Sequence, residues 1–519
     1  MTNRSQHQRV VLLVLDGWGL SLHEEGNAIA RANTPVMDRL VSSEFGTVLS
    51  ASGESVGLPH GLAGNSEVGH LHLGSGRIVP QDLTRINAAI QDGTFFQNPV
   101  FLSALHHARS NGSKLHIMGL LSHGGVHSEA SHLYALLEMI RDRGFEKETF
   151  LHIFTDGRDT PPRHAQTQLA ELQEIMNELG CGHIASVSGR HYAMDRAHNW
   201  KRVQKVYDVM VEGKGQTATS AQEAIERAYD QGLDDQHIPP TVITNGGDAP
   251  VATLAEDDVV IFFNLRSDRA RQLTKPFVLR DFSFFPRKTV LDHVHFVGMT
   301  NFGDDLPMSI AFPADPVRNA IPEVLSRRQN LRQLYIAEEE KFAHVSYFFR
   351  GGSSIPYDNE ERVMVDSLDI ESYKAKPDMS SNEVTELVEK AVRSAEGELF
   401  VLANYPNADV LGHTGDLEAT IQAIEALDVH IGELVKVAEE TNTHLIITAD
   451  HGNAEELIDP ETGEVRTQHT TNPVPCILLT PRELPKTLQE GGLINVAPTI
   501  LDLLGIEPPT EMTATSLVS

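Results

Sequence analysis

Residues 10–19, VVLLVLDGWG, contain an unbroken apolar run that stops at Asp16. Such a run, closed by a glycine-containing loop, is typical of a buried strand. Asp16 therefore stands at the carboxyl end of a predicted strand. In open α/β sheets this end carries the loops that bind ligands.

The same alternation of strand, loop and helix continues along the chain. Further strands are predicted at residues 115–121, 150–154, 183–187, 259–263, 399–404, 445–448 and 476–479. Helices are predicted at residues 35–40 (with Thr34 as cap), 131–143, up to 179, 417–439 and 496–504. This alternation predicts largely parallel sheets of the α/β class. A chain of 519 residues is too long for one ordinary core, so we expect more than one domain.

Composition restricts the possible partners. The chain has 42 Lys and Arg against 72 Asp and Glu, a net charge of −30. Such a charge disfavours broad binding to nucleic acid or to an anionic membrane surface. No apolar run approaches the ~18 residues of a membrane span, and the polar start is unlike a signal peptide. We expect a cytoplasmic protein in which the two cysteines, Cys181 and Cys476, are reduced core residues.

Several residues in the last quarter have the character of metal ligands. Asp409 and His413 are four positions apart, Asp450 and His451 are adjacent after a predicted strand, and His469 follows. Any one of these residues, taken alone, more often has a structural role than a role in metal binding. However, Asp16, Asp409 and Asp450 all follow predicted strands. In a parallel sheet they would share one edge. Mixed carboxylate and imidazole ligands, with no thiolate, suit two divalent ions such as manganese, cobalt or zinc.

Ser66 lies in GNSEVGH, residues 64–70, at a predicted helix start. One interpretation is that it is only the helix N-cap. The other is that it is a nucleophile, because coordination to a metal would generate its alkoxide. Together with the candidate ligands, this favours a metal-dependent enzyme that transfers a phosphoryl group through phosphoserine.

The loops after the strands between residues 80 and 312 contain arginine or histidine. Arg158, Arg190, Arg266 and Arg269 all stand at predicted strand ends, so one edge of this region should form a basic pocket. Guanidinium forks suit a bidentate grip on carboxylate and phosphate. The predicted layout is a discontinuous domain, residues 1–79 plus 313–519, with residues 80–312 inserted.

Eight motifs together resemble one known family. They are LDGWG (15–19), GNSEVGH (64–70), GGVHS (124–128), DGRDT (156–160), YAMDR (192–196), residues 337–344, GHTG (412–415) and TADHGNAE (448–455). Over nearly its whole length the chain resembles the cofactor-independent phosphoglycerate mutases of the alkaline phosphatase superfamily. The resemblance implies two three-layer α/β/α domains, one alkaline-phosphatase-like and the other a substrate-binding lid. It also implies interconversion of 3-phosphoglycerate and 2-phosphoglycerate with two Mn²⁺ ions (Co²⁺, Zn²⁺ or Mg²⁺ being possible) and without 2,3-bisphosphoglycerate.

The resemblance also implies roles for individual residues. One metal would be held by Asp409, His413 and His469, and the other by Asp16, Ser66, Asp450 and His451. Ser66 would be the nucleophile, and Asp159 is a candidate to handle the proton of the glycerate hydroxyl. The substrate would be bound by His127, Arg158, Asp159, Arg190, Arg196, Arg266, Arg269 and Lys341. Lys341 follows three glutamates, where a solvated charge is the default, and only the resemblance singles it out.

Two rival hypotheses remain open at this stage. One is another metal-dependent phosphatase or a phosphopentomutase of the superfamily, which the arginine loops disfavour. The other is a non-catalytic metal-dependent binding protein, which the presence of Ser66 and every candidate ligand disfavours. We expect a monomer, because closure of the cleft needs only the two domains of one chain.

Overall fold

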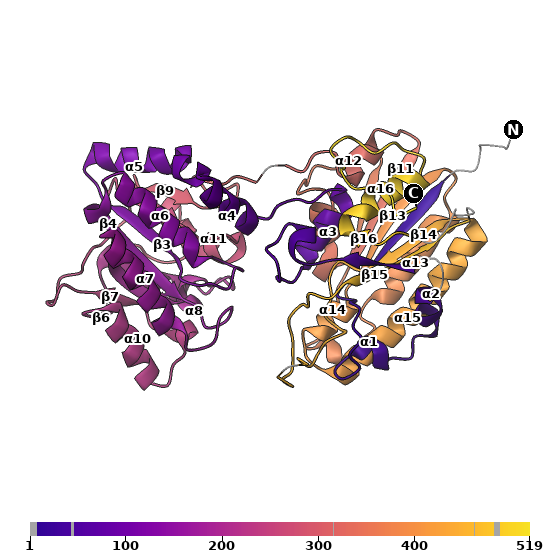
Figure 1. The fold of residues 1–519 in the computed structure, drawn as a ribbon, viewed down its shortest axis with the longest axis horizontal. Helices are drawn as coiled ribbons and strands as arrows, with labels where there is room; N and C mark the ends of the chain where they lie inside the picture. Colours follow the sequence, from indigo (N-terminus) through magenta and orange to yellow (C-terminus); the bar gives the residue numbers. More distant parts are fainter. Residues whose placement is uncertain (1–7, 43–45, 315, 461, 482–487, 519) are drawn as a thin grey trace. The chain divides into compact units, whose positions relative to one another are not determined.

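The computed structural model describes residues 8–42, 46–314, 316–460, 462–481 and 488–518. The chain forms two compact units (Figure 1). The first comprises Met1–Gln81 with Pro316–Ser519, and the second comprises Asp82–Asp315. The sequence predicts the corresponding breaks at 79/80 and 312/313.

The first unit is built on an eight-stranded sheet in the order β12-β11-β13-β1-β14-β15-β2-β16. Its strands are β1 (Arg9–Leu15), β2 (Gly46–Ser50), β11 (Leu331–Glu338), β12 (Glu360–Val365), β13 (Glu398–Tyr405), β14 (His444–Thr448), β15 (Val474–Leu479) and β16 (Gly491–Gly492). β15 runs antiparallel to β14 and to β2, and the other described pairs are parallel. β1 lies between β13 and β14, and its side chains from Val10 to Leu15 are buried. This explains its unbroken apolar sequence.

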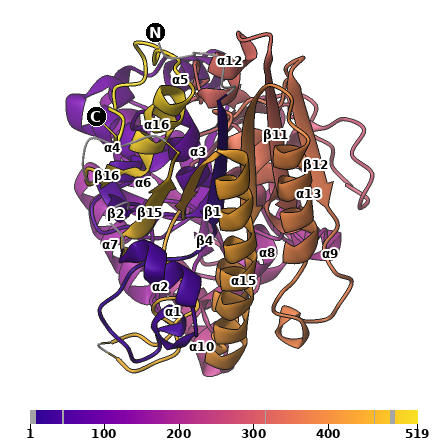
Figure 2. The ribbon, with the colours of Figure 1, turned by 90° about the vertical axis from the view of Figure 1, so that its right-hand side faces the viewer.

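Helices cover this sheet. They are α1 (Ala28–Arg31), α2 (Pro35–Val41), α3 (Ser66–Ser75), α12 (Ile321–Ser326), α13 (Ser381–Arg393), α14 (Asn407–Gly412), α15 (Leu417–Thr441) and α16 (Val496–Leu503). Figure 2 shows α13 and α15 side by side in front of the strands. α15 begins where the Asp416 side chain accepts a hydrogen bond from the Ala419 backbone N–H, and ends at Asn442 in the left-handed conformation.

The second unit has its own eight-stranded sheet, in the order β10-β9-β8-β3-β4-β5-β7-β6. Its strands are β3 (Leu115–Leu120), β4 (Thr149–Thr155), β5 (His183–Gly189), β6 (Gln216–Ala218), β7 (Thr241–Ile243), β8 (Val259–Phe262), β9 (His295–Gly298) and β10 (Ser309–Ile310). Its helices are α4 (Asp82–Asp92), α5 (Pro99–Asn111), α6 (Ala130–Asp142), α7 (Ala165–Leu179), α8 (Arg190–Ala193), α9 (Trp200–Glu212), α10 (Ala221–Asp230) and α11 (Ser267–Val278). The four predicted strands β8, β3, β4 and β5 are parallel neighbours at its centre.

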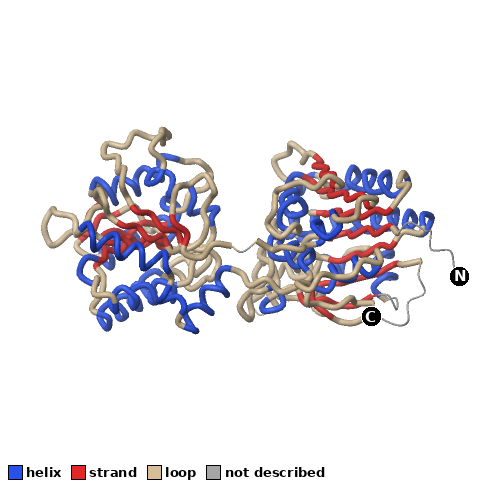
Figure 3. The backbone as a smooth tube through the Cα atoms, turned by 90° about the horizontal axis from the view of Figure 1, so that it is seen from above, coloured by secondary structure: helices blue, strands red, loops and turns tan. Residues whose placement is uncertain are grey.

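In each unit a layer of strands lies between layers of helices (Figure 3), which confirms the predicted α/β class. The sequence predicted neither β11, an eight-residue strand inside the first sheet, nor the strands nearer the sheet margins. β12, for example, has three charged residues followed by three apolar ones, which its position as a partly buried edge strand permits. Within the described ranges, every helix is too short or too polar to cross a bilayer.

Two smaller predictions have different outcomes. Cys181 and Cys476 are both buried free thiols, as predicted. Thr34 stands at the N-cap position of α2, as predicted, but its side chain makes no capping hydrogen bond. The Thr34 hydroxyl instead donates to the Asp38 carboxylate at 3.0 Å. Pro35 lies in the first turn of the helix, as predicted.

Candidate active site

The candidate site of the first unit lies at the carboxyl edge of β13, β1 and β14. These strands are parallel neighbours, so the loops that follow them meet. Asp16 and Asp450 follow β1 and β14, while Asp409 lies in α14 just after β13. The Asp409 N–H donates to the Asp16 carbonyl at 3.0 Å, which joins two of these segments directly.

Ser66 is the first residue of α3 and not its cap. The cap is Asn65, whose side-chain oxygen accepts from the Val68 N–H at 3.0 Å. The interpretation of Ser66 as an N-cap is therefore wrong, and its hydroxyl is left to other partners. Its Oγ lies 3.2 Å from Asp16 Oδ1 and 3.0 Å from His451 Nε2.

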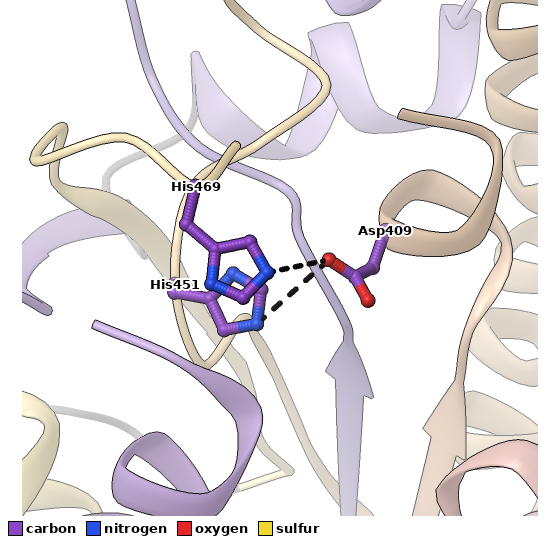
Figure 4. Close-up of side chains that lie close together, drawn as sticks. All are labelled: Asp409, His451 and His469. Atoms are coloured by element: carbon purple, nitrogen blue, oxygen red, sulfur yellow. Dashed lines mark ion pairs between the residues drawn. The ribbon is translucent and has the colours of Figure 1, made fainter. Parts of the chain in front are cut away.

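One group of candidate ligands surrounds Asp409. Its Oδ1 is 3.3 Å from His413 Nε2, 3.2 Å from His469 Nε2 and 4.0 Å from His451 Nε2. Figure 4 shows His451 and His469 stacked and both facing this carboxylate. The predicted trio of Asp409, His413 and His469 thus comes together.

The orientation of two rings fits a metal ion there. His413 Nδ1 lies 2.7 Å from the Thr467 carbonyl, and His469 Nδ1 lies 2.9 Å from the Gly64 carbonyl. A carbonyl only accepts, so each Nδ1 carries a proton and each Nε2 is the ring nitrogen left to face Asp409. The two Nε2 atoms are 3.0 Å apart, and this orientation of the rings is the one that metal-ligating histidines take.

The second group consists of Asp16, Ser66, Asp450 and His451, all buried. His451 Nε2 is 3.4 Å from Asp16 Oδ1 and 3.5 Å from Asp450 Oδ2. Asp450 Oδ1 accepts from two backbone N–H groups, at Gly17 and at His451. Its Oδ2 is buried and accepts no hydrogen bond from any residue in the described ranges, so it too fits a metal ligand.

Lys341 belongs to this cluster. Its side chain is only 7% exposed, and Nζ donates at 2.7 Å to each of Asp16 Oδ1, Asp409 Oδ2 and Ser66 Oγ. The default expectation of a solvated charge is therefore wrong. The residue ends a single 3₁₀ turn, Glu339–Lys341, in which the two glutamates are exposed and Lys341 is buried.

Charges in the cluster stabilise one another. Burial opposes ionisation of Asp16 and of Asp409, but the Lys341 ammonium holds the pKa of both carboxyl groups well below the usual range. Burial likewise lowers the pKa of His451, yet Asp450 and Asp16 raise that pKa to about 9. The two aspartates are therefore ionised at neutral pH, as metal ligands must be.

In the second unit, the loops after β3, β4, β5 and β8 carry the predicted substrate-binding residues. Arg190 is buried, and its Nη1 pairs with Asp156 at 2.5 Å and with Asp159 at 2.7 Å. Arg196 donates to Asp268 at 2.8 Å, and Arg266 lies 3.8 Å from the same carboxylate. Of the other predicted residues, Arg158 is exposed and His127 is buried. Arg269 donates a hydrogen bond to the Met194 carbonyl at 3.2 Å.

The electrostatics of these loops favour an anion. Burial and the neighbouring Arg196 lower the pKa of Arg269 to about 10, because cations are crowded there. Burial and Arg190 lower the pKa of His127 to about 3, so this ring is neutral. His127 Nδ1 and Asp268 Oδ1 are buried without a hydrogen-bond partner among the described residues. Unlike the other loop residues, Lys341 belongs to the first unit.

Sequence reasoning missed several polar residues of both sites. In the first unit they are His70, Asn404, Asn453 and Glu455, and in the second they are Asp156 and Asp268. His70 Nδ1 lies 3.2 Å from Asp450 Oδ2, and these residues form a possible metal-binding group with Asp16. His70 is one helical turn beyond Ser66, a spacing that could have revealed it. Asn404 donates to Asp16 Oδ2 at 2.9 Å, a contact between distant segments that no local pattern signals.

The fold and the site first define a class. A buried serine beside two groups of carboxylate and imidazole ligands, on the carboxyl edge of a mostly parallel sheet, characterises the alkaline-phosphatase-like α/β enzymes. Residues 322–472 match the family model "Type I phosphodiesterase / nucleotide pyrophosphatase", and residues 86–304 match "BPG-independent PGAM N-terminus".

Whole-chain relatives identify the family. A 2,3-bisphosphoglycerate-independent phosphoglycerate mutase 1 of Methanosarcina acetivorans is 47% identical over 98% of both chains. A mutase of the same name from Moorella thermoacetica is 46% identical over 98% of both. The solved structure of Leishmania mexicana phosphoglycerate mutase at low cobalt concentration has a TM-score of 0.79 and 32% identity, covering 100% of this chain and 99% of that one. The chain belongs to the family of 2,3-bisphosphoglycerate-independent phosphoglycerate mutases, which are isomerases.

Proposed function

We propose that the chain interconverts 3-phosphoglycerate and 2-phosphoglycerate through a phosphoserine formed on Ser66. The observation that carries this proposal is the position of Ser66 Oγ, within 3.2 Å of Asp16 Oδ1, His451 Nε2 and Lys341 Nζ. A hydroxyl that contacts candidate ligands and a buried ammonium is suited to act as a nucleophile. The whole-chain relatives, which are phosphoglycerate mutases, support this proposal over the two rival hypotheses.

We assign the candidate ligands to two divalent ions, Mn²⁺ in the first instance. Asp409, His413 and His469 would hold one ion, and Asp16, Ser66, Asp450 and His451 the other. Bound ions supply Lewis acidity that lowers the pKa of the serine hydroxyl and offsets phosphoryl charge. Lys341 adds a fixed positive charge 2.7 Å from Ser66 Oγ, where it would stabilise the alkoxide.

The proposed transfer has two steps. The Ser66 hydroxyl gives up its proton and Oγ forms a bond to phosphorus while the bond from phosphorus to the glycerate oxygen breaks, and that oxygen takes up a proton. The other glycerate hydroxyl then gives up its proton and attacks the phosphoserine, which breaks the bond to Ser66 Oγ, and Oγ takes up a proton again. Asp159 is our candidate for the group that exchanges protons with the glycerate hydroxyls.

We propose that the second unit supplies the substrate-binding residues. The five predicted arginines stand among four aspartates in its loops (Asp156, Asp159, Asp195 and Asp268), so guanidinium groups outnumber these carboxylates and would attract an anionic carboxylate or phosphate. The residues assigned to this role are His127, Arg158, Arg190, Arg196, Arg266 and Arg269. Lys341 is assigned to the nucleophile instead.

A mutase assay tests the proposal. The metal-free protein is supplied with 3-phosphoglycerate, with and without Mn²⁺, and no 2,3-bisphosphoglycerate is added. We expect 2-phosphoglycerate to form only with the metal, and mass spectrometry of quenched protein to find phosphate on Ser66. Activity that survives removal of the metal would overturn the proposal. Release of inorganic phosphate at a rate matching turnover would point to a hydrolase.

We further propose that the protein is a cytoplasmic monomer that acts on small molecules. Its two buried free thiols agree with a reducing compartment. Sedimentation at several protein concentrations tests the oligomeric state. A concentration-dependent shift to a dimer would contradict this proposal.

A further inference from the structure

Glu455 is a buried carboxylate to which the proposed mechanism gives no role. The residue is 1% exposed, and its carboxylate accepts four hydrogen bonds. Oε2 accepts from the backbone N–H groups of Gly19 at 3.1 Å and of Asn453 at 2.8 Å. Oε1 accepts from the Thr470 hydroxyl and from Asn472 Nδ2, the latter at 3.0 Å. Four donors saturate the acceptor capacity of a carboxylate.

These four donors belong to three loops that carry candidate metal ligands. Gly19 lies three residues after Asp16, and Asn453 lies two residues after His451. Thr470 directly follows His469. Because both oxygens of Glu455 are occupied by these loops, the carboxylate is not itself a metal ligand. It thus joins segments from both proposed metal groups.

Asp409, on the remaining ligand-bearing segment, is joined through Asn453. The Asn453 backbone N–H donates to Glu455, while its side-chain Nδ2 donates to Asp409 Oδ1 at 3.1 Å. That Oδ1 is the atom faced by His413 and His469. Movement of Glu455 would therefore be transmitted to Asp409 as well.

The surrounding backbone is shaped for this carboxylate. A Cβ atom on Gly19 would lie 2.3 Å from the carboxyl carbon of Glu455. A Cβ atom on Gly452 would lie 2.5 Å from Glu455 Oε1. Only residues without a side chain allow both loops to approach so closely. Both the loop of Gly19 and the loop of Gly452 therefore leave room for the Glu455 carboxylate.

We infer that Glu455 is a positioning residue that holds the ligand-bearing loops of both metal groups in binding geometry. This inference rests on the proposed function, since it assumes that these groups bind metal. Groups that orient metal ligands typically change metal affinity about 10–100-fold when they are removed. Glu455→Gln would keep the shape of the side chain but would turn an amide NH2 group, itself a donor, toward two of the four donors.

The test measures Mn²⁺ binding to the full-length, metal-free protein by calorimetry. We expect Glu455→Gln to weaken Mn²⁺ binding about 10–100-fold, with mutase activity recovering at high Mn²⁺ concentration. Thermal unfolding of the metal-free variant should remain cooperative and close to that of the wild type. The matched control is Glu456→Gln, because Glu456 is also buried but bonds to Arg466 and Asn472. Its Mn²⁺ affinity should stay within about twofold of the wild-type value, well below the effect at Glu455.

Gly19→Ala is a second variant. It keeps glutamate at position 455, but the added methyl group would push the Glu455 carboxylate away from its present position. It should weaken Mn²⁺ binding in the same direction, whereas Gly247→Ala, which adds a methyl group in open space, should not. Unchanged Mn²⁺ affinity in Glu455→Gln and Gly19→Ala would overturn the inference. Equal losses in Glu455→Gln and Glu456→Gln would also overturn it. A wild-type protein that binds no Mn²⁺ would instead overturn the proposed function.

Discussion

The two units place clusters of opposite charge on the same kind of edge. In the first unit, three aspartates meet one lysine at the carboxyl ends of parallel strands, and every member is buried. In the second, the five predicted arginines stand among four aspartates at the carboxyl ends of parallel strands. There Arg158 is exposed and the Arg196 side chain is 57% exposed.

This difference shows how an acidic protein can act on an anion. In the proposed function the buried carboxylates would hold metal cations, and those cations would offset the negative charge of a phosphoryl group. The arginine loops provide a local positive field that opposes the net charge of −30. The same sheet edge serves both purposes because the loops, and not the strands, carry the chemistry.

The largest expected effect separates chemistry from binding. Ser66→Ala should lower the mutase rate at least ~10⁴-fold, because the proposed phosphoryl intermediate forms on this hydroxyl. Mn²⁺ and 3-phosphoglycerate should still bind, which calorimetry would measure alongside turnover. Ser110→Ala, at an exposed serine of α5, is the control and should leave the rate unchanged. A near-normal rate in Ser66→Ala would remove the serine from the mechanism.

The next variant removes the ammonium group of the buried cluster. Lys341→Met leaves Asp16 and Asp409 without their shared partner, and loss of one member of a buried ion pair costs about 3–5 kcal/mol. We expect a lower melting temperature for the metal-free protein and partial recovery on adding Mn²⁺. Lys374→Met, which removes an exposed ion pair with Asp416, is the control. Equal melting temperatures in both variants would contradict the charge balance described here.

A substitution in the arginine loops should act on substrate and not on metal. Arg158→Lys keeps the charge but loses the planar fork, so KM for 3-phosphoglycerate should rise about tenfold. Because Arg158 is exposed, stability and Mn²⁺ affinity should stay at the wild-type values. If Arg158→Lys changed the Mn²⁺ affinity and left KM unchanged, the proposal that the second unit binds substrate and the first unit binds metal would be contradicted.

The smallest effect concerns acid stability in the second unit. Burial lowers the pKa of His132 to about 4, below the ordinary value of 6.5. His132 therefore binds a proton more readily in the unfolded chain than in the folded protein. The stability that the neutral, buried ring gives the folded state is complete above pH 6.5 and is lost as the pH falls toward 4. Between pH 7 and 5 the wild type should lose about 1–2 kcal/mol more stability than His132→Gln, as measured by denaturant unfolding. Parallel pH profiles for the two proteins would exclude this role for His132.

Much of the fold could be predicted because long buried strands have unbroken apolar sequences. β1 and β8 follow this rule, and β3, β4, β5, β13 and β14 are mainly apolar with a few polar residues inside or at their ends. Edge strands such as β12 escaped prediction because partial exposure permits charged residues, and the interior strand β11 did so because Arg332 and Gln333 interrupt its apolar sequence. Asp16, Asp409, Asp450 and His451 could be selected because they follow strand ends, whereas Ser66, His413 and His469 were selected for their residue type and neighbouring motifs. Asp268, although it stands in a recognised arginine loop, could not be assigned before its neighbours were known.

The sequence by itself determined the strand ends, the residue types at them and the family resemblance, because these depend on local order along the chain. Only the tertiary structure decided how Ser66, Lys341 and Glu455 are used. Asn65, and not Ser66, caps α3, and Lys341 leaves its acidic run to enter a buried cluster. Glu455 joins loops centred far apart in sequence. These roles depend on contacts across the sheet edge, which exist only once the chain has folded.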